Sequence, residues 1–228
     1  PNQQAIPATD YYLEELGIEK FALLGTDYVY PRTTNKILNQ YLIDKGISES
    51  DIFVNYTPFG HSDWSKIVAD VVALGADGKK VGVISTINGD ANIGFYKELA
   101  AAGVNAEDIP VVAFSVGEEE LSGLDTTNLV GHLAAWNYFQ SAESDLNTAF
   151  IKSWKSKMGS ERVTNDPMEA HVIGFKMYVK AVEKAGTTDV DAVRKAMYGM
   201  KVPNLTGGTA EMLPNHHLSK PVLIGEIL

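Results

Sequence analysis

Two tyrosines separated by one residue, Tyr28 and Tyr30, follow shortly after a run of apolar residues at positions 21–24. Their rings could form the wall of a small pocket while their hydroxyl groups donate hydrogen bonds to a ligand. The same pair could also belong to a loop whose tyrosines only pack against their neighbours. These residues alone favour neither interpretation.

A second polar group, Asn88, Gly89 and Asp90, follows another apolar run at positions 81–85. Asn88 offers a donor and an acceptor, Asp90 offers acceptors, and Gly89 lets the backbone come close to a ligand. Urea and small amides need this mixture, because their NH₂ groups donate and their carbonyl oxygen accepts. Asn-Gly-Asp is also common turn chemistry, and taken alone these residues favour a plain turn.

A regular alternation of strands and helices is predicted to position both groups. Strands are predicted at residues 21–24, 51–56, 81–85 and 110–114, and helices at 33–45, 64–74 and 91–102. We expect Thr33 or Thr34 to cap the first of these helices. Alternation with short connections indicates an α/β fold with a parallel sheet. Because such sheets bind ligands at the carboxyl ends of their strands, both polar groups are expected to face one site.

The rest of the chain lacks this regular alternation of strands and helices. Residues 116–201 are predicted to be mainly helical, with one strand at 127–133, and a further helix is predicted at 5–16. The tail returns to strands at 209–212 and 221–227. We therefore predict that the chain leaves the α/β unit near Ser115 and returns to it near Val202.

The composition excludes several classes of function. The 228 residues carry a formal net charge of −10 and no cysteine. An acidic chain is a poor partner for nucleic acid or for an anionic membrane. The lack of cysteine excludes disulfides, thiolate catalysis and cysteine-bound metal.

Motifs for catalysis, metals and cofactors are also missing. His61 and Asp63 flank a serine that lacks the complete Gly-x-Ser-x-Gly pattern of a nucleophile elbow. The adjacent His216 and His217 have no carboxylate at ligand spacing. No glycine-rich nucleotide loop is present. We therefore predict no catalytic residue, no metal and no cofactor.

Three stretches together resemble one protein family. They are GTDYVYPRTTNK at 25–36, INGDANIGFYKEL at 87–99 and MLPNHHLSKPVLIGEI at 212–227. In this order they are similar to the urea-binding proteins of bacterial ABC importers, and to the related protein that binds short amides and controls amidase expression. The resemblance implies a type I periplasmic binding protein, with two flavodoxin-like α/β lobes, a hinge and a ligand in the cleft.

The resemblance also implies which residues bind the ligand. Both tyrosines of the family's YxYP motif line the site, and they match Tyr28 and Tyr30. The family's loop after the later strand matches residues 87–90, which brings in Asn88, Gly89 and Asp90. A threonine at the end of the next strand matches Ser115.

The family implies a division into lobes that this chain would fill in part. Residues 18–115 with 202–228 would form a complete lobe 2, and residues 1–17 with 116–201 a partial, mainly helical lobe 1. The family has a further segment before the position of Pro1, which carries the first strands of lobe 1 and half of the ligand site. Helices left without those strands would expose apolar faces, so we expect a homodimer or a rearrangement.

The implied function is an extracytoplasmic binding protein that delivers urea or a short-chain amide to an ABC permease. The implied location is periplasmic or extracellular, with a lipid anchor in the full-length form as one option. An amide-sensing regulatory domain is the alternative. A flavodoxin-like enzyme is a third reading, which the missing catalytic motifs disfavour.

Overall fold

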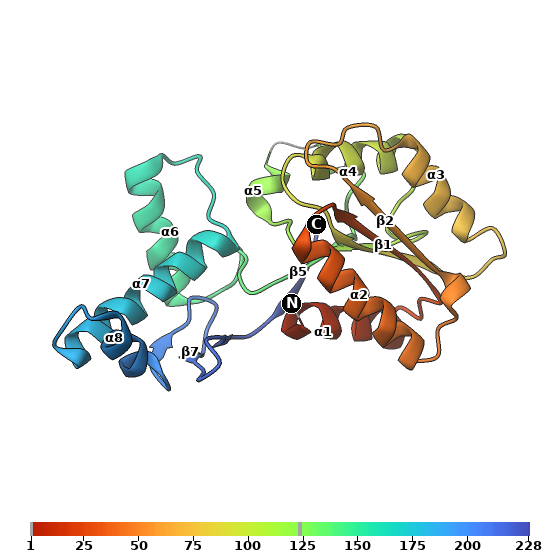
Figure 1. Ribbon diagram of the computed structural model, residues 1–228. Helices are drawn as coiled ribbons and strands as arrows, with labels where there is room; N and C mark the ends of the chain where they lie inside the picture. The colour runs from red at the N-terminus through yellow and green to blue at the C-terminus, as the bar shows by residue number, and fades with distance from the viewer. Residues whose placement is uncertain (1, 123–124) are drawn as a thin grey trace. The chain divides into compact units, whose positions relative to one another are not determined.

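The computed structural model describes residues 2–122 and 125–228, which form two compact units. Unit 1 comprises Pro1–Trp136 and Ile224–Leu228, and unit 2 comprises Asn137–Leu223. Both are seen in Figure 1. The positions of the two units relative to each other are not determined, so each is described by itself.

Unit 1 is built on a six-stranded sheet in the order β2-β1-β3-β4-β5-β9. The strands are β1 (Lys20–Thr26), β2 (Ile52–Thr57), β3 (Val81–Thr86), β4 (Val111–Ala113), β5 (Leu133–Trp136) and β9 (Leu223–Glu226). The four pairings from β2 to β5 are all parallel. The predicted α/β fold with a parallel sheet is thus confirmed.

Helices cover both faces of this sheet (Figure 1). They are α1 (Asn2–Glu14), α2 (Val29–Asp44), α3 (Ser65–Leu74), α4 (Ala91–Ala101) and the short α5 (Glu118–Leu121), with a 3₁₀ turn at Glu49–Asp51. Successive residues of β1 point to opposite faces. Phe21 and Leu23 join the core beneath α1 and α2, while Ala22 and Leu24 join the core beneath α3 and α4.

The first helix belongs to this sheet and not to the mainly helical part of the chain. Ala5, Ala8 and Tyr12 of α1 are buried in the same core as Phe21. A Cβ atom at Gly82 of β3 would lie 2.8 Å from the Tyr12 ring, so only glycine lets α1 pack here. The prediction that the helix at 5–16 exposes an apolar face is therefore wrong.

Three other boundaries differ from the sequence predictions. Residues 127–131 form turns, and β5 begins only at Leu133, where pairing with Val112 of β4 starts. Residues 116–136 stay with unit 1, and residues 202–223 belong to unit 2. The return to the sheet therefore lies at β9, which begins at Leu223, and not near Val202.

The first turn of α2 starts earlier than predicted. The helix begins at Val29 with Tyr28 as its N-cap residue, so neither Thr33 nor Thr34 caps it. Pro31 fits in this first turn, because the backbone N–H groups there have no partner within the helix. As a result Tyr30 is carried by the helix and not by a loop.

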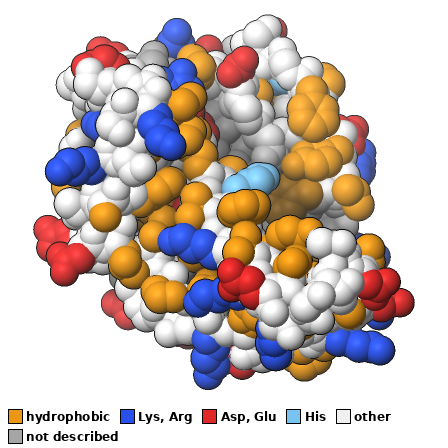
Figure 2. Space-filling view, turned by 90° about the vertical axis from the view of Figure 1, so that its left-hand side faces the viewer, with side chains coloured by type: hydrophobic (Ala, Val, Ile, Leu, Met, Phe, Trp, Pro, Cys, Tyr) orange, Lys and Arg blue, Asp and Glu red, His pale blue; other side chains and the backbone are white. Residues whose placement is uncertain are grey.

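Unit 2 consists of three helices and a small antiparallel sheet. The helices are α6 (Asp145–Met158), α7 (Asp166–Ala185) and α8 (Val190–Met197), and the strands are β6 (Lys201–Pro203), β7 (Thr209–Met212) and β8 (Leu218–Ser219). Ile173 and Met177 of α7 are buried with Val202 and Ala210 of the sheet. Other apolar side chains of unit 2 remain on the surface that Figure 2 shows.

Candidate functional site

The carboxyl ends of three neighbouring strands bring the predicted site residues to one edge of the unit 1 sheet. Tyr28 and Tyr30 follow β1, Asn88 to Asp90 follow β3, and Ser115 follows β4. These strands are neighbours in the order β2-β1-β3-β4. All six predicted residues therefore lie along the edge where open α/β sheets bind ligands. Their role in binding stays a prediction.

Aromatic rings occupy the part of this edge that follows β1 and β2. The ring centroids of Tyr28 and Tyr30 are 6.1 Å apart, and those of Tyr28 and Phe59 are 5.1 Å apart. The backbone N–H of Asp27 donates to the carbonyl oxygen of Thr57 at 2.7 Å, which joins the two loops. Phe59 was not predicted as a site residue, although an aromatic residue between proline and glycine just after a predicted strand could have indicated it.

Polar groups occupy the part of the edge that follows β3 and β4. The Ser115 hydroxyl donates to Asn88 Oδ1 at 3.1 Å, and Asn88 Nδ2 donates to the carbonyl oxygen of Thr86 at 3.0 Å. The backbone N–H of Asn88 donates to Thr26 Oγ1 at 2.9 Å. Asn88 is thus fixed by three elements, which leaves its side chain oriented before any ligand arrives.

The loop after β3 exposes its remaining groups. Gly89 has φ +66°, a conformation that favours glycine, and a Cβ atom there would meet only open space. Asp90 is exposed at the start of α4. The buried Asn92, which the sequence analysis did not single out, donates to the carbonyl oxygens of Ile87 and Gly89 at 3.1 and 3.2 Å. These bonds tie the loop to the first turn of α4.

The two phenols stay protonated at neutral pH. Burial raises the pKa of Tyr30 to about 12, with a further rise from neighbouring Tyr28 and a partial offset from a hydrogen bond with Ser115. Burial also raises the pKa of Tyr28. Both hydroxyl groups can therefore donate to a ligand oxygen.

An ion pair neutralises the charge beside the aromatic rings. Arg32 Nε donates to Asp27 Oδ1 at 2.5 Å, and this bond lowers the pKa of the Asp27 carboxyl. The guanidinium also lies 4.7 Å from the centre of the Tyr56 ring. This part of the edge thus presents a paired charge, which suits a neutral solute better than an ionic one.

Gly25 determines how closely α2 approaches the sheet. A Cβ atom there would lie 2.5 Å from Thr86 Oγ1 and 2.7 Å from Pro31 Cβ. Thr86 Oγ1 in turn bonds the carbonyl oxygen of Leu24 at 3.0 Å and lies 3.2 Å from Asn35 Oδ1. Tyr28 and Tyr30 owe their place at the edge to this close contact.

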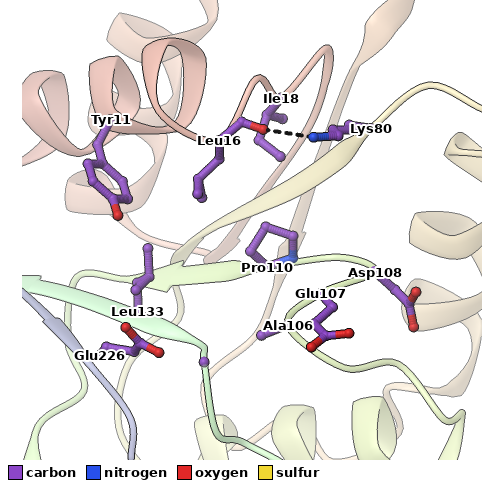
Figure 3. Close-up of a pocket in the computed structure, with 11 residues that line it drawn as sticks. Tyr11, Leu16, Ile18, Lys80, Ala106, Glu107, Asp108, Pro110, Leu133 and Glu226 are labelled. Carbon is purple, nitrogen blue, oxygen red and sulfur yellow. Dashed lines mark hydrogen bonds between the residues drawn. The ribbon is translucent and has the colours of Figure 1, made fainter.

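A separate cavity lies at the amino ends of the strands (Figure 3). It has a volume of about 300 Å³, and Tyr11, Lys80, Pro110, Leu133 and Glu226 are among its lining residues. Lys80 Nζ donates to the carbonyl oxygen of Leu16 at 3.3 Å. Because this end of the sheet is opposite to the ligand-binding end, the cavity is not the candidate solute site.

Residues 2–122 and 125–228 hold neither a metal-binding cluster nor a membrane-spanning helix. In these ranges, no three histidine, aspartate or glutamate side chains come together as a metal site would require. In the same ranges, no helix combines the length and the apolar character needed to cross a bilayer.

Comparison with solved structures shows the same fold at low sequence identity. A solute-binding protein of an ABC transporter from Rhodopseudomonas palustris HaA2, in complex with p-hydroxybenzoic acid, is 20% identical with a TM-score of 0.85. The similarity covers 99% of this chain and 60% of that one. An amino acid ABC transporter substrate-binding protein from Pseudomonas fluorescens Pf-5 is 18% identical with a TM-score of 0.80, over 98% of this chain and 57% of that one.

Among curated proteins, a short stretch is similar to a limonene hydroxylase from Geobacillus stearothermophilus. It is 29% identical over 96 residues, which is 42% of this chain and 18% of that protein. The chain thus spans less than a fifth of this curated relative, and about 60% of the length of the solved structures that it matches.

A family model gives the most extensive match. The model is described as a periplasmic binding protein domain, and it matches residues 1–228. The sheet order, the helices on both faces and the solved structures agree with a type I fold of this kind. The chain belongs to the family of periplasmic binding protein domains.

Proposed function

We propose that this chain is part of an extracytoplasmic solute-binding protein that delivers urea or a short-chain amide to an ABC permease. One observation carries the proposal: at the carboxyl ends of the strands, the rings of Tyr28 and Tyr30 lie 6.1 Å apart, and Ser115 is hydrogen-bonded both to the Tyr30 phenol and to the oriented amide of Asn88. Two solved relatives are binding proteins of ABC transporters, which supports the transport role. On this proposal the chain binds its solute and does not transform it.

The chemistry of the edge suits a small, neutral, planar amide. Such a solute is fully hydrogen-bonded in water, so a site gains affinity only by offering each donor and acceptor a partner. Tyr28 and Tyr30 offer donors for a carbonyl oxygen, while Asp90 and Ser115 offer acceptors for NH₂ groups. Gly89 leaves room for the solute to reach the backbone.

The first prediction concerns solute affinity in the complete gene product that contains this chain. Tyr30→Phe keeps the ring and removes one donor, so it should weaken urea or amide binding by about 0.5–1.5 kcal/mol. Asp90→Ala should cost at least as much, because charged acceptors make stronger hydrogen bonds. Isothermal titration calorimetry with urea and acetamide measures both effects.

The matched control is Tyr178→Phe, which removes a half-exposed phenol in unit 2. It should leave solute affinity unchanged. Unaltered affinity in both Tyr30→Phe and Asp90→Ala would show that the solute binds elsewhere. The proposed function would be contradicted if the wild-type protein bound neither urea nor any short amide.

The second prediction concerns self-association of the 228-residue chain, which we propose to occur through the exposed apolar face of α7. Phe175 is 67% exposed, and Met168, His171 and Val172 line a hollow that also includes Trp154 of α6. Apolar surface of this kind favours association. Light scattering should show a mass that rises with concentration.

Phe175→Asp should abolish this rise in mass, because it places a charge in the middle of the apolar face. Val190→Asp is the control, since Val190 is exposed and lies on a different helix, α8. A strict monomer at all concentrations would contradict the homodimer.

A further inference from the structure

The ligand-binding edge of unit 1 is divided into an aromatic half and a polar half. Phe59 follows β2, Tyr28 and Tyr30 follow β1, Asn88 follows β3 and Ser115 follows β4. Since the strand order is β2-β1-β3-β4, the aromatic residues occupy one side of the row and the polar residues the other. A solute on this edge would meet different chemistry at its two ends.

Phe59 extends the wall beyond what urea needs. Neighbouring strands lie about 4.8 Å apart, so the distance from the end of β3 across β1 to the end of β2 is about 10 Å. Urea is smaller than one tyrosine ring, and it could be enclosed by Tyr28, Tyr30 and the polar loops alone. A solute that also reaches Phe59 must be longer than urea.

A tight turn and a ring contact fix the position of Phe59. The residue lies in a tight turn in which the backbone N–H of His61 donates to the carbonyl oxygen of Pro58 at 3.2 Å, and Gly60 has φ +73°. The ring is 64% exposed, yet it stays 5.1 Å from the ring of Tyr28 at an interplanar angle of 41°. Its free face is available for apolar contact.

We propose that Phe59 is a specificity-determining residue which selects amides or urea derivatives that carry a short alkyl or aryl group. The polar head would lie against Asn88, Ser115 and the phenol of Tyr30. The apolar tail would lie on Tyr28 and Phe59. This inference rests on the proposed function and refines its substrate class.

The test is calorimetry on the complete gene product with a series of solutes: urea, acetamide, butyramide and benzamide. Each methylene group that becomes buried should raise wild-type affinity by up to roughly fourfold. Phe59→Ala should lower the affinity for butyramide and benzamide roughly tenfold and leave urea within about twofold. Phe59→Leu, which keeps apolar bulk, should retain most of the affinity for butyramide.

Val190→Ala serves as the control, because it truncates an exposed apolar side chain on α8 in unit 2. It should not change any affinity in the series. An equal loss for urea and butyramide in Phe59→Ala, or no loss for either, would overturn the inference while leaving the proposed function intact. If the wild-type protein binds no member of the series, the proposed function fails and this inference fails with it.

Discussion

Replacing Lys220 with methionine is expected to destabilise unit 2 by about 3–5 kcal/mol, the usual cost of breaking one side of a buried ion pair. Glu169 is fully buried near the start of α7, and Lys220, whose side chain is only 6% exposed, pairs with its Oε2 atom. Glu169 Oε1 has no partner among the described residues. Without Lys220, the carboxylate would stay buried with no compensating charge.

A second buried carboxyl increases this effect. Asp166 accepts a hydrogen bond from the backbone N–H of Asn137 at 2.9 Å. Burial raises the pKa of Asp166 to about 6, and Lys220 is the main group that opposes this rise. Asn137 Nδ2 also donates to the carbonyl oxygen of Pro221 at 2.8 Å, so Lys220 lies in a segment that is bonded to the start of unit 2.

Hydrogen exchange of the α7 amides measures this prediction. Protection factors should fall roughly 100- to 5,000-fold in Lys220→Met. The double variant Glu169→Gln, Lys220→Met should recover much of the loss, because replacing both partners of a buried pair is often close to neutral. Lys184→Met, which removes a less buried lysine of α7, is the control. Wild-type protection in Lys220→Met would show that the pair contributes nothing to unit 2.

The parallel sheet could be predicted from local patterns because its strands are buried on both faces. Residues 21–24 and 81–85 are continuous apolar runs, as such strands require. The real start of β5 could not be found this way. Its boundary is set by pairing with β4, where Leu133 lies opposite Val112, and such pairing has no signature in the local sequence.

The assignment of segments to units depended on contacts between distant residues. Helix α1 looks like any amphipathic helix, but Gly82, far away in the sequence, leaves the space in which Tyr12 packs. The sequence of residues 202–223 predicted that this segment returns to the unit 1 sheet. In the structure, however, Val202 and Ala210 are buried against α7. Only the packing shows which core receives each segment. How these units correspond to the lobes of a whole binding protein stays a prediction.

The sequence predicted the loops of the candidate site, but not the buried residues that hold those loops in place. Tyr28, Asn88 and Ser115 were placed together because they follow parallel strands, and the structure has them along one edge. Thr26 and Asn92, which hold the loop after β3, were missed since buried polar residues resemble ordinary helix and strand positions. Phe59 was missed because a single aromatic residue in a turn has many explanations.

Acid should weaken unit 1 through His132, by about 2–3 kcal/mol between about pH 6.5 and pH 4.5. The imidazole is fully buried, its Nδ1 atom accepts a hydrogen bond from the backbone N–H of Val111 at 3.1 Å, and Nε2 has no partner among the described residues. Burial lowers the pKa of His132 to about 4 from an ordinary value of 6.5. The folded protein therefore holds the ring neutral where the unfolded chain would protonate it.

The direction of the effect follows from proton uptake. Between about pH 6.5 and pH 4, unfolding takes up a proton at His132, so the free energy of unfolding falls as the pH falls. Asp166 in unit 2 acts in the opposite direction, because its raised pKa makes the folded state bind a proton more readily than the unfolded state as the pH falls through about 6. The two units should thus respond differently to acid.

Hydrogen exchange of the β4 and β5 amides, corrected for the intrinsic exchange rate, measures the effect of His132 at several pH values. His132→Asn keeps an acceptor near the position of Nδ1 but cannot titrate in this range. The variant should be less stable than the wild type at about pH 7, because it loses ring packing, and its stability should stay nearly flat down to about pH 4.5. An equal slope in variant and wild type would mean that another group causes the acid sensitivity of unit 1. A His132 imidazole that titrates near 6.5 by NMR would show that the ring is not held neutral by the fold.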